Sequence, residues 1–356
     1  MTGERTATRN PTRGRTAKSA TDSKSGGGPL LVTLGDPNGV GPRIVARALA
    51  RRKVAKLGLV AVGDPAVFRE ALVAEGVDLP LVPWSPSRPI VPGAVHLWTP
   101  DGLEPGTIEP GAVRRWAGGQ SLRCVDAATA LCLEGKARGM VTAPLAKESV
   151  SLVLPGFSGH TGHIARLCGV EAHCLCLVHE HLWAAFVTTH IALREVSTAV
   201  TTEGIVATTL LLDQALRRSG IQAPRIGIAG LNPHAGEHGL FGDEEARVVE
   251  PAVGILEAKG LDVTGPWPAD VVFPMLNAGR IDGVTSLYHD QGHPVMKTLA
   301  FDFRKGLVRG VNVTLGLPIV RTSPDHGTGF DIAWRRSADD GSLLDAIGLA
   351  DRMSRP

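Results

Sequence analysis

The sequence predicts an α/β fold of two domains with a largely parallel sheet. Short apolar runs alternate with amphipathic stretches along most of the chain, which is the pattern of strands connected by helices. A length of 356 residues exceeds what one small core usually takes and suits two domains. Hydrophobic residues make up 43% and charged residues 20%, which is ordinary for a globular enzyme.

The expected strands cover residues 30–34, 57–62, 139–142, 174–178, 183–188, 225–229, 283–287 and 311–315. The expected helices cover residues 42–52, 65–75, 120–134, 161–168, 203–218, 244–259 and 343–353. The first helix illustrates the reasoning, because Pro42 suits a first helical turn. The apolar residues that follow it fall on one helical face: Ile44, Val45, Ala48 and Leu49.

A glycine-rich turn, residues 35–41, separates the first strand from this helix. Such a turn can offer backbone N–H groups to an anion at a helix N-terminus. The spacing of Gly35, Gly39 and Gly41 matches neither a P-loop nor a dinucleotide-binding fingerprint. Taken alone, a tight structural turn is therefore the favoured interpretation.

Composition argues against several classes of partner. The formal charge of +2 gives no reason to expect nucleic acid or a membrane surface, and no run of about 18 apolar residues predicts a membrane span. Residues 1–28 carry six basic and two acidic side chains without an apolar segment. They predict a disordered tail, with an organelle transit peptide as the alternative. Five cysteines without Cys-x-x-Cys spacing predict buried free thiols and a cytoplasmic protein.

Histidine marks the candidate site. Three of the twelve histidines follow predicted strands beside turn or acidic residues: His190, His234 and His289. Loops at the carboxyl ends of parallel strands gather on one edge of a sheet, where ligands usually bind. Three imidazoles suit zinc or another late first-row divalent ion. The three lie far apart in the chain and form no local motif, so ordinary hydrogen-bonded histidines remain the alternative.

Six segments together resemble the 4-hydroxythreonine-4-phosphate dehydrogenase family. They occur in family order as Thr188-Thr189-His190, Leu231-Asn232-Pro233-His234-Ala235-Gly236-Glu237, Gly265-Pro266-Trp267-Pro268-Ala269-Asp270, Tyr288-His289-Asp290-Gln291-Gly292, Gly310-Val311-Asn312-Val313-Thr314-Leu315-Gly316-Leu317-Pro318 and Arg321-Thr322-Ser323-Pro324-Asp325-His326-Gly327-Thr328. The resemblance implies an isocitrate/isopropylmalate dehydrogenase-like fold with a cleft between two domains. It also implies one divalent metal (zinc, or magnesium, manganese, cobalt or nickel) on His190, His234 and His289. The metal would lie at a homodimer interface, with ligands from both subunits.

The resemblance assigns substrate contacts to His160, Thr161, Lys297, Asn312 and Arg321. This choice is chemically sensible, because Lys and Arg supply charge to a phosphorylated acid while Asn and Thr supply directed hydrogen bonds. A solvated surface charge is the ordinary role of a lone Lys or Arg, and the flanking motifs favour substrate binding instead.

The segment from His326 to Asp331 resembles the nucleotide-binding loop of isocitrate and isopropylmalate dehydrogenases. The resemblance implies that His326, Gly327, Thr328 and Asp331 bind NAD. A carboxylate at the position of Asp331 favours NAD over NADP, because it accepts a hydrogen bond from a ribose hydroxyl and repels a 2′-phosphate. A simple polar turn is the alternative.

The implied reaction is NAD-dependent oxidation of a phosphorylated hydroxy acid, followed by decarboxylation. Asp290, Asp270 and Lys297 are the candidate proton-transfer or orienting groups. The domains are expected to be discontinuous: residues 29–148 plus 305–356 on the nucleotide side, and residues 149–304 for metal, substrate and dimerisation.

Two departures from the family leave the substrate open. Gly162 stands where the family usually has Glu after Gly-His-Thr, and the stretch between Lys297 and Asn312 is longer than in the biosynthetic enzymes. This stretch contains Asp302, Arg304, Lys305 and Arg309 and is a candidate lid. The expected substrate is 4-hydroxy-L-threonine 4-phosphate, as in pyridoxine biosynthesis. The alternatives are a four-carbon sugar-acid phosphate, a cyclic dihydrodiol carboxylate, or a metabolite-binding protein without catalysis.

Overall fold

The computed structural model describes residues 28–302, 304, 307–335 and 338–355. The tail predicted for residues 1–28 therefore lies outside the described residues, apart from Gly28. The strands of the main sheet are β1 (Leu30–Thr33), β2 (Leu59–Val62), β3 (Leu81–Pro83), β4 (Val95–Trp98), β5 (Gly139–Thr142), β6 (Cys174–His179), β7 (Leu182–Phe186), β8 (Arg225–Ala229), β9 (Asp262–Trp267), β10 (Gly283–Ser286), β13 (Val311–Leu315) and β14 (Arg321–Pro324). A separate hairpin consists of β11 (Phe301–Asp302) and β12 (Leu307–Val308).

Helices connect these strands and cover both faces of the sheet. They are α1 (Gly41–Ala50), α2 (Arg52–Ala55), α3 (Pro65–Ala74), α4 (Arg115–Leu133), α5 (Lys147–Ser151), α6 (His160–Leu167), α7 (Val196–Ala199), α8 (Thr202–Arg218), α9 (Glu250–Ala258), α10 (Ala269–Asn277), α11 (His289–Ala300) and α12 (Gly341–Met353). None of the helices in the described ranges combines the length and the apolar character needed to cross a membrane.

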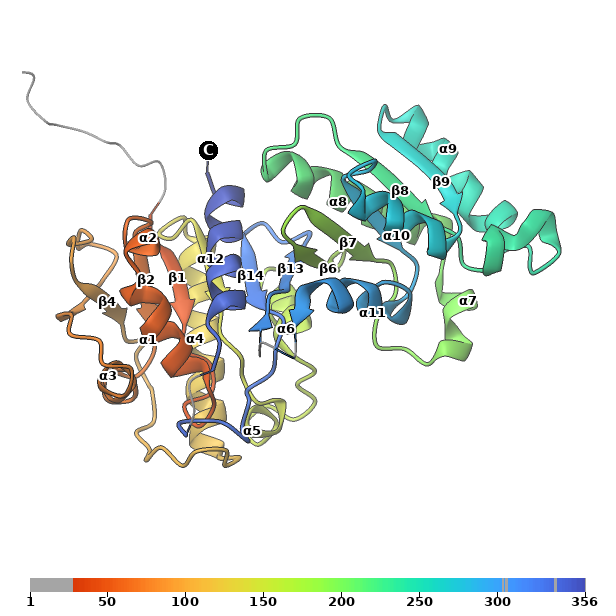
Figure 1. Ribbon diagram of the computed structural model, residues 1–356. Helices are drawn as coiled ribbons and strands as arrows, with labels where there is room; N and C mark the ends of the chain where they lie inside the picture. The colour runs from red at the N-terminus through yellow and green to blue at the C-terminus, as the bar shows by residue number, and fades with distance from the viewer. Residues whose placement is uncertain (1–27, 303, 305–306, 336–337, 356) are drawn as a thin grey trace, which may run out of the picture.

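The strands form a twelve-stranded sheet in the order β3-β4-β2-β1-β5-β14-β13-β6-β7-β10-β8-β9. Neighbouring strands run parallel except at three central pairs, where β13 opposes β14 and β6, and β6 opposes β7. Figure 1 shows β13 and β14 in the middle of the molecule, between the N-terminal strands and the strands of the middle segment. The predicted α/β class with a mostly parallel sheet is confirmed.

The elements predicted from apolar patterns are present. Every predicted strand occurs, with ends that match or differ by one or two residues. Three of the missed elements have compositions that argue against them. The helices α10 and α11 contain Pro274 and Pro294, and proline is costly inside a helix. The short strand β14 has the polar sequence Arg-Thr-Ser-Pro, yet all four residues are buried.

Alternating residues of the central strands build separate cores on the two faces. Leu30 and Val32 of β1 join a core that includes residues of α1, α8 and α12. Leu31 faces the other way and joins a core with α4 and α6. A third core lies where α10 and α11 cover β7 and β10. This period-two alternation buries the central strands on both faces.

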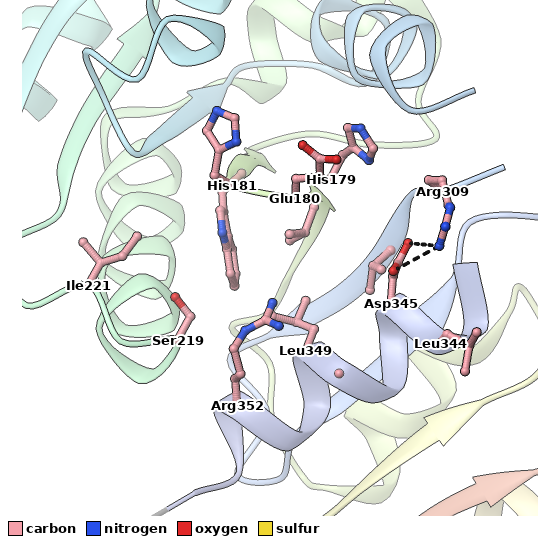
Figure 2. A pocket seen from close by; sticks show the side chains of 14 residues that line it. His179, Glu180, His181, Ser219, Ile221, Arg309, Leu344, Asp345, Leu349 and Arg352 are labelled. Atoms are coloured by element: carbon pink, nitrogen blue, oxygen red, sulfur yellow. Dashed lines mark hydrogen bonds and ion pairs between the residues drawn. The ribbon is translucent and has the colours of Figure 1, made fainter. Parts of the chain in front are cut away.

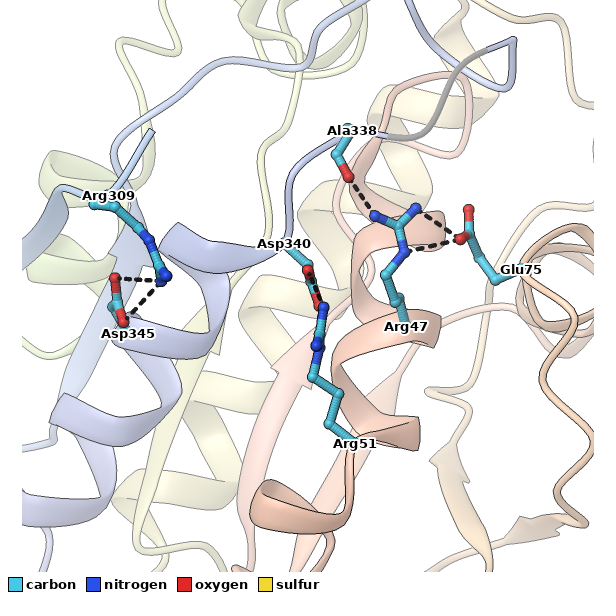
Figure 3. A network of polar contacts seen from close by, with 7 residues as sticks. All are labelled: Arg47, Arg51, Glu75, Arg309, Ala338, Asp340 and Asp345. Carbon is cyan, nitrogen blue, oxygen red and sulfur yellow. Dashed lines mark hydrogen bonds and ion pairs between the residues drawn. The ribbon is translucent and has the colours of Figure 1, made fainter. Parts of the chain in front are cut away.

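An ion pair and a hydrogen bond fasten the segment before the C-terminal helix to the N-terminal part (Figure 3). Arg51 pairs with Asp340 at 2.7 Å, just before α12 begins, and Arg47 of α1, which also pairs with Glu75, donates to the carbonyl oxygen of Ala338. Residues near the two ends of the described chain therefore pack together. A domain made of residues 29–148 and 305–356 requires such packing, and the boundaries of both domains stay predictions.

All five cysteines are free, and four of them are buried. Burial raises the pKa of Cys124, Cys132 and Cys174 to about 12, so these side chains stay protonated near neutral pH. The prediction of buried free thiols is confirmed for these positions. Buried neutral thiols behave as small apolar side chains.

Two adjacent glycines in α4 give a test of the packing between α4 and α5. A Cβ on Gly118 would lie 2.0 Å from the carbonyl oxygen of Ser149, whereas a Cβ on Gly119 would first meet Val153 at 3.8 Å. Gly118→Ala should therefore lower the free energy of unfolding by about 1–3 kcal/mol through overpacking. Gly119→Ala should raise it by about 0.5–1 kcal/mol through helix propensity. Urea denaturation of both variants measures the difference, and equal effects would contradict the close approach.

Candidate active site

A cavity of about 560 Å³ lies over the central strands, where α5, α6, α11 and the loop after β14 meet. Its walls include most of the residues singled out from the sequence for substrate, metal or cofactor binding. These are His160, Thr161, His190, His289, Lys297, Asn312, Arg321, His326 and Gly327. The fold thus brings together segments that are far apart in the chain.

Arg321 is the buried cation of this cavity. It is the first residue of β14, and its side chain donates to the hydroxyl of Thr142 at 2.7 Å and to that of Thr314 at 3.1 Å. Within the described ranges no carboxylate forms an ion pair with it. Burial lowers its pKa to about 10, which still leaves the guanidinium charged at neutral pH. A buried charge without a counter-ion is unfavourable, so the site is suited to an anionic ligand.

His160 and Thr161 open α6 beside this cation. The Nε2 atom of His160 is buried and has no hydrogen-bond partner in the described structure. Burial holds its pKa well below the usual range, and Arg321 adds to the effect. A neutral imidazole that faces the cavity can donate one hydrogen bond to a ligand or accept one from it.

Lys297 and Asn312 approach the cavity from α11 and β13. They share one partner, Asp325, which sequence reasoning did not single out. Asn312 Nδ2 donates to Asp325 Oδ1 at 3.0 Å, and Lys297 Nζ lies 3.7 Å from Asp325 Oδ2. The only available signal was that Asp325 precedes His326 within a motif already recognised. The sequence also missed Lys147, which lines the same cavity.

Two of the three predicted metal ligands are neighbours. The ring centroids of His190 and His289 lie 5.6 Å apart. His289 Nδ1 is hydrogen-bonded to Asp290 Oδ1 at 2.6 Å, which leaves Nε2 for a ligand. Burial lowers the pKa of His190, and His289 and Lys147 lower it further. This favours the neutral imidazole that a metal ion needs.

His293 also belongs to this histidine group. Its ring stacks on that of His289, with centroids 3.6 Å apart, and contacts Phe186 at 4.3 Å. It therefore restricts the orientation of the His289 ring. The sequence places it just after the metal motif, as a candidate for contact with the metal ligands.

His234 and Asp270 lie away from the cavity walls. His234 is in the turn Pro233–Gly239, with its ring near Phe241, and Asp270 is exposed in the first turn of α10. Consequently, the part of the chain that the structure describes holds no group of three or more His, Cys, Asp or Glu arranged to bind a metal ion. One chain brings only His190 and His289 together.

Only part of the predicted cofactor loop lines the cavity. His326 and Gly327 line the cavity, and His326 Nε2 is buried without a partner in the described structure. Thr328 instead packs on the glycine-rich turn, where its carbonyl accepts from Val40 N–H at 2.9 Å. Asp331 is exposed beyond the cavity walls. The turn before α1 is thus hydrogen-bonded to the predicted cofactor loop.

A second cavity, of about 650 Å³, lies between α8, α12 and the β6–β7 turn (Figure 2). Val178 and Val311 line it, whereas Asn312 lines the first cavity, so the two cavities occupy opposite faces of the sheet. Arg309 lines the second cavity and pairs with Asp345 at 3.1 Å. Of the stretch proposed as a lid, this arginine therefore points to the other face.

Comparison with known proteins identifies the family. Residues 55–350 match the family model described as pyridoxal phosphate biosynthetic protein PdxA. This chain belongs to the PdxA family. A D-threonate 4-phosphate dehydrogenase of Pectobacterium atrosepticum is 38% identical over 91% of this chain and 99% of the relative. A 4-hydroxythreonine-4-phosphate dehydrogenase of Beijerinckia indica is 39% identical over 92% of this chain and 96% of the relative.

Solved structures give the same result for the fold. A 4-hydroxythreonine-4-phosphate dehydrogenase from Klebsiella pneumoniae superposes with a TM-score of 0.83 at 39% identity, covering 94% of this chain and all of that one. A terephthalate 1,2-cis-dihydrodiol dehydrogenase from Burkholderia xenovorans gives a TM-score of 0.66 at 28% identity, covering 91% and 97%. The predicted family and the predicted dehydrogenase class are confirmed.

The unpaired charge of Arg321 gives a test of the cavity. With inorganic phosphate at about 100 times its dissociation constant, wild-type protein should gain about 2.7 kcal/mol of stability. Arg321→Met should lose this gain, while its stability without phosphate should stay equal or rise because a desolvated charge has been removed. Thermal unfolding with and without phosphate measures both. Arg309→Met is the matched control, and loss of the phosphate effect in that variant instead would assign the anion to the other cavity.

Proposed function

We propose that this PdxA-family chain is an NAD-dependent, divalent-metal-dependent dehydrogenase that oxidises and decarboxylates a phosphorylated four-carbon hydroxy acid. The observation that carries the proposal is the buried, unpaired Arg321 beside the pair His190 and His289. A guanidinium without a counter-ion suits a phosphate. Two neighbouring imidazoles suit a metal ion next to the carbon that is oxidised.

The lining of the cavity favours a sugar-acid phosphate, such as D-threonate 4-phosphate, over 4-hydroxythreonine 4-phosphate. The two acids differ in that the second carries an ammonium group. Asp325 is the one acidic side chain among the described residues that line the cavity, and it already contacts Lys297 and Asn312. Gly162 stands where the family usually has Glu. An ammonium group would thus meet Lys147 and Arg321 without a free carboxylate to offset them.

The chain's own residues divide the work in this proposal. Arg321 and His160 hold the phosphate, and Lys297 with Asn312 contacts the acid end, where Lys297 is placed to donate a proton. Asp290 holds the His289 ring through Nδ1, so that Nε2 would be free to bind the ion. When bound, the ion favours the alkoxide form of the substrate hydroxyl, and NAD supplies the oxidant.

The residues of the cavity suit a metal ion and a nucleotide to different degrees. The donor set His190 and His289 suits zinc or another late first-row ion, with His234 as a third ligand from a second subunit. The unpaired Nε2 of His326 and the open space at Gly327 suit a nucleotide beside the loop. Asp331 is exposed, so a preference for NAD over NADP stays a prediction. The ratio of the rates measured with NAD and with NADP tests it. We also propose a cytoplasmic location, because free thiols persist in a reducing compartment.

Exposed apolar side chains support a homodimer with shared sites. Leu193, close to His190 in the chain, is 73% exposed, and Leu240, close to His234, is 72% exposed. Exposed apolar side chains close to both ligands are expected if these surfaces meet another subunit. In that arrangement His234 of one subunit completes the pair His190 and His289 of the other.

A dehydrogenase assay tests the function and the choice of substrate. Wild type should reduce NAD with D-threonate 4-phosphate at least about tenfold faster, in kcat/KM, than with 4-hydroxy-L-threonine 4-phosphate, a difference of about 1.4 kcal/mol. Gly162→Glu should move the preference toward the amine-bearing acid, because it supplies a carboxylate for the ammonium group. A side chain fits at this position, since a Cβ there has only ordinary contacts, at 3.7 Å or more. Gly162→Gln is the uncharged control. Turnover of neither acid would contradict the proposed function.

Mixed mutants test the shared metal site. His190→Ala and His234→Ala should each be inactive and fail to retain metal. After the two variants are mixed and allowed to exchange subunits, about a quarter of the sites should be intact, because a hybrid C2 dimer has one site that contains all three histidines. Activity and metal content should both return. A mixture of His190→Ala and His289→Ala is the control, and recovery there would contradict the assignment of both ligands to one chain.

A further inference from the structure

One carboxylate lies among the cations of the active-site cavity. Asp325 directly follows β14, and its side chain is only 10% exposed. Among the described residues that line the cavity it is the single acid, beside Lys147, Lys297 and Arg321. Its presence needs an explanation, because a carboxylate repels the anionic substrate that this cavity is proposed to bind.

The two oxygens of Asp325 bind different partners. Oδ1 accepts from Asn312 Nδ2 at 3.0 Å, and Oδ2 lies 3.7 Å from Lys297 Nζ. The ammonium also lies 5.5 Å from the centroid of the Phe301 ring. A carboxylate and an aromatic ring thus restrict the direction of the lysine. One group therefore fixes both an amide and an ammonium at the cavity wall.

The backbone holds Asp325 firmly in this position. Its N–H lies within hydrogen-bond distance of the Gly310 carbonyl, at 3.0 Å, and of Ser342 Oγ, at 3.1 Å. The Ser342 hydroxyl in turn donates to the same carbonyl. A Cβ on Gly310 would lie 3.0 Å from Asp325 Cβ and 3.1 Å from Oδ2. Glycine at position 310 thus leaves the room that the carboxylate occupies.

The charge balance fits a holding role. Burial raises the pKa of Asp325, and Lys297 and the Asn312 hydrogen bond act in the opposite direction. The carboxylate thus depends on the same two side chains that it holds. Such mutual dependence is typical of a hydrogen-bonded network whose members fix one another's positions.

We infer that Asp325 is a positioning residue, which holds Lys297 and Asn312 in the arrangement that the reacting substrate needs. The inference rests on the proposed function, in which both side chains contact the substrate. Asp325 therefore acts through its neighbours. Its removal should affect the rate more than the binding of the substrate.

The isosteric variant Asp325→Asn separates these effects. Its carbonyl oxygen can still accept from Asn312, while the amide group cannot pair with the Lys297 ammonium. We expect kcat to fall about 10- to 100-fold through misplacement of Lys297, with KM unchanged or lower because repulsion of the substrate has been removed. Lys297→Ala should raise KM as well. The double variant should be no slower than Lys297→Ala alone, because the two residues act as one unit.

Asp345→Asn is the matched control. Asp345 is another partly buried carboxylate, paired with Arg309 at 3.1 Å and lining the cavity on the opposite face. This variant should keep wild-type kcat and KM. Additive losses in the double variant Asp325→Asn/Lys297→Ala would overturn the inference, because Asp325 would then contact the substrate itself.

A crystal structure of Asp325→Asn provides a readout without turnover. We expect the Lys297 ammonium to move by more than about 1 Å, a misplacement large enough to cost rate, while the surrounding backbone stays in place. Lys297 and Asn312 in their wild-type positions would refute the positioning role, whatever the activity. A wild-type enzyme that oxidises none of the phosphorylated acids would refute the proposed function instead, and the crystal structure would still decide the role of Asp325.

Discussion

The position of Arg321 is the constraint on which the rest of this structure depends. The fold places a guanidinium, only 3% exposed, on a central strand and gives it threonine hydroxyls rather than a carboxylate in the described structure. Such a charge destabilises the protein unless a bound anion pairs with it. The apolar cores on both faces of the sheet must therefore provide the stability that this site lacks. Stability and ligand binding are consequently separated within the same strands.

The alternation of the central strands makes this separation possible. In β13, Val311 and Val313 belong to the core with α8 and α12, whereas Asn312 lines the cavity on the other face. The antiparallel pairing of β13 and β14 places Asn312 opposite Ser323, two residues before Asp325. Polar groups from distant motifs thus lie side by side at the cavity, on the face opposite the valines of the same strand. A shift of one residue in this register would exchange the two faces.

The sequence predicted the elements that carry apolar patterns and, through the family motifs, the residues that line the cavity. It did not predict α11, because Gly292 and Pro294 oppose a helix that tertiary packing nevertheless imposes. It also missed Asp325, since the importance of this residue lies in contacts made across two strands and a helix. Propensity is local, whereas a cavity depends on which distant segments meet. Neither the second cavity nor the separation of His234 from its expected partners could be read from residue spacing.

The backbone conformation at two of the proposed metal ligands also supports a role in ligand binding. His190 and His234 have φ values of 55° and 52°, in the left-handed region that costs a residue other than glycine about 1–2 kcal/mol. In the described structure, neither imidazole forms a hydrogen bond that would offset this cost. Backbone strain of this kind clusters at ligand-binding sites, where a ligand can use the conformation. A metal ion bound between two subunits would do so, and the strained turns would then be offset on assembly. Catalysis in this protein would accordingly depend on association as well as on folding.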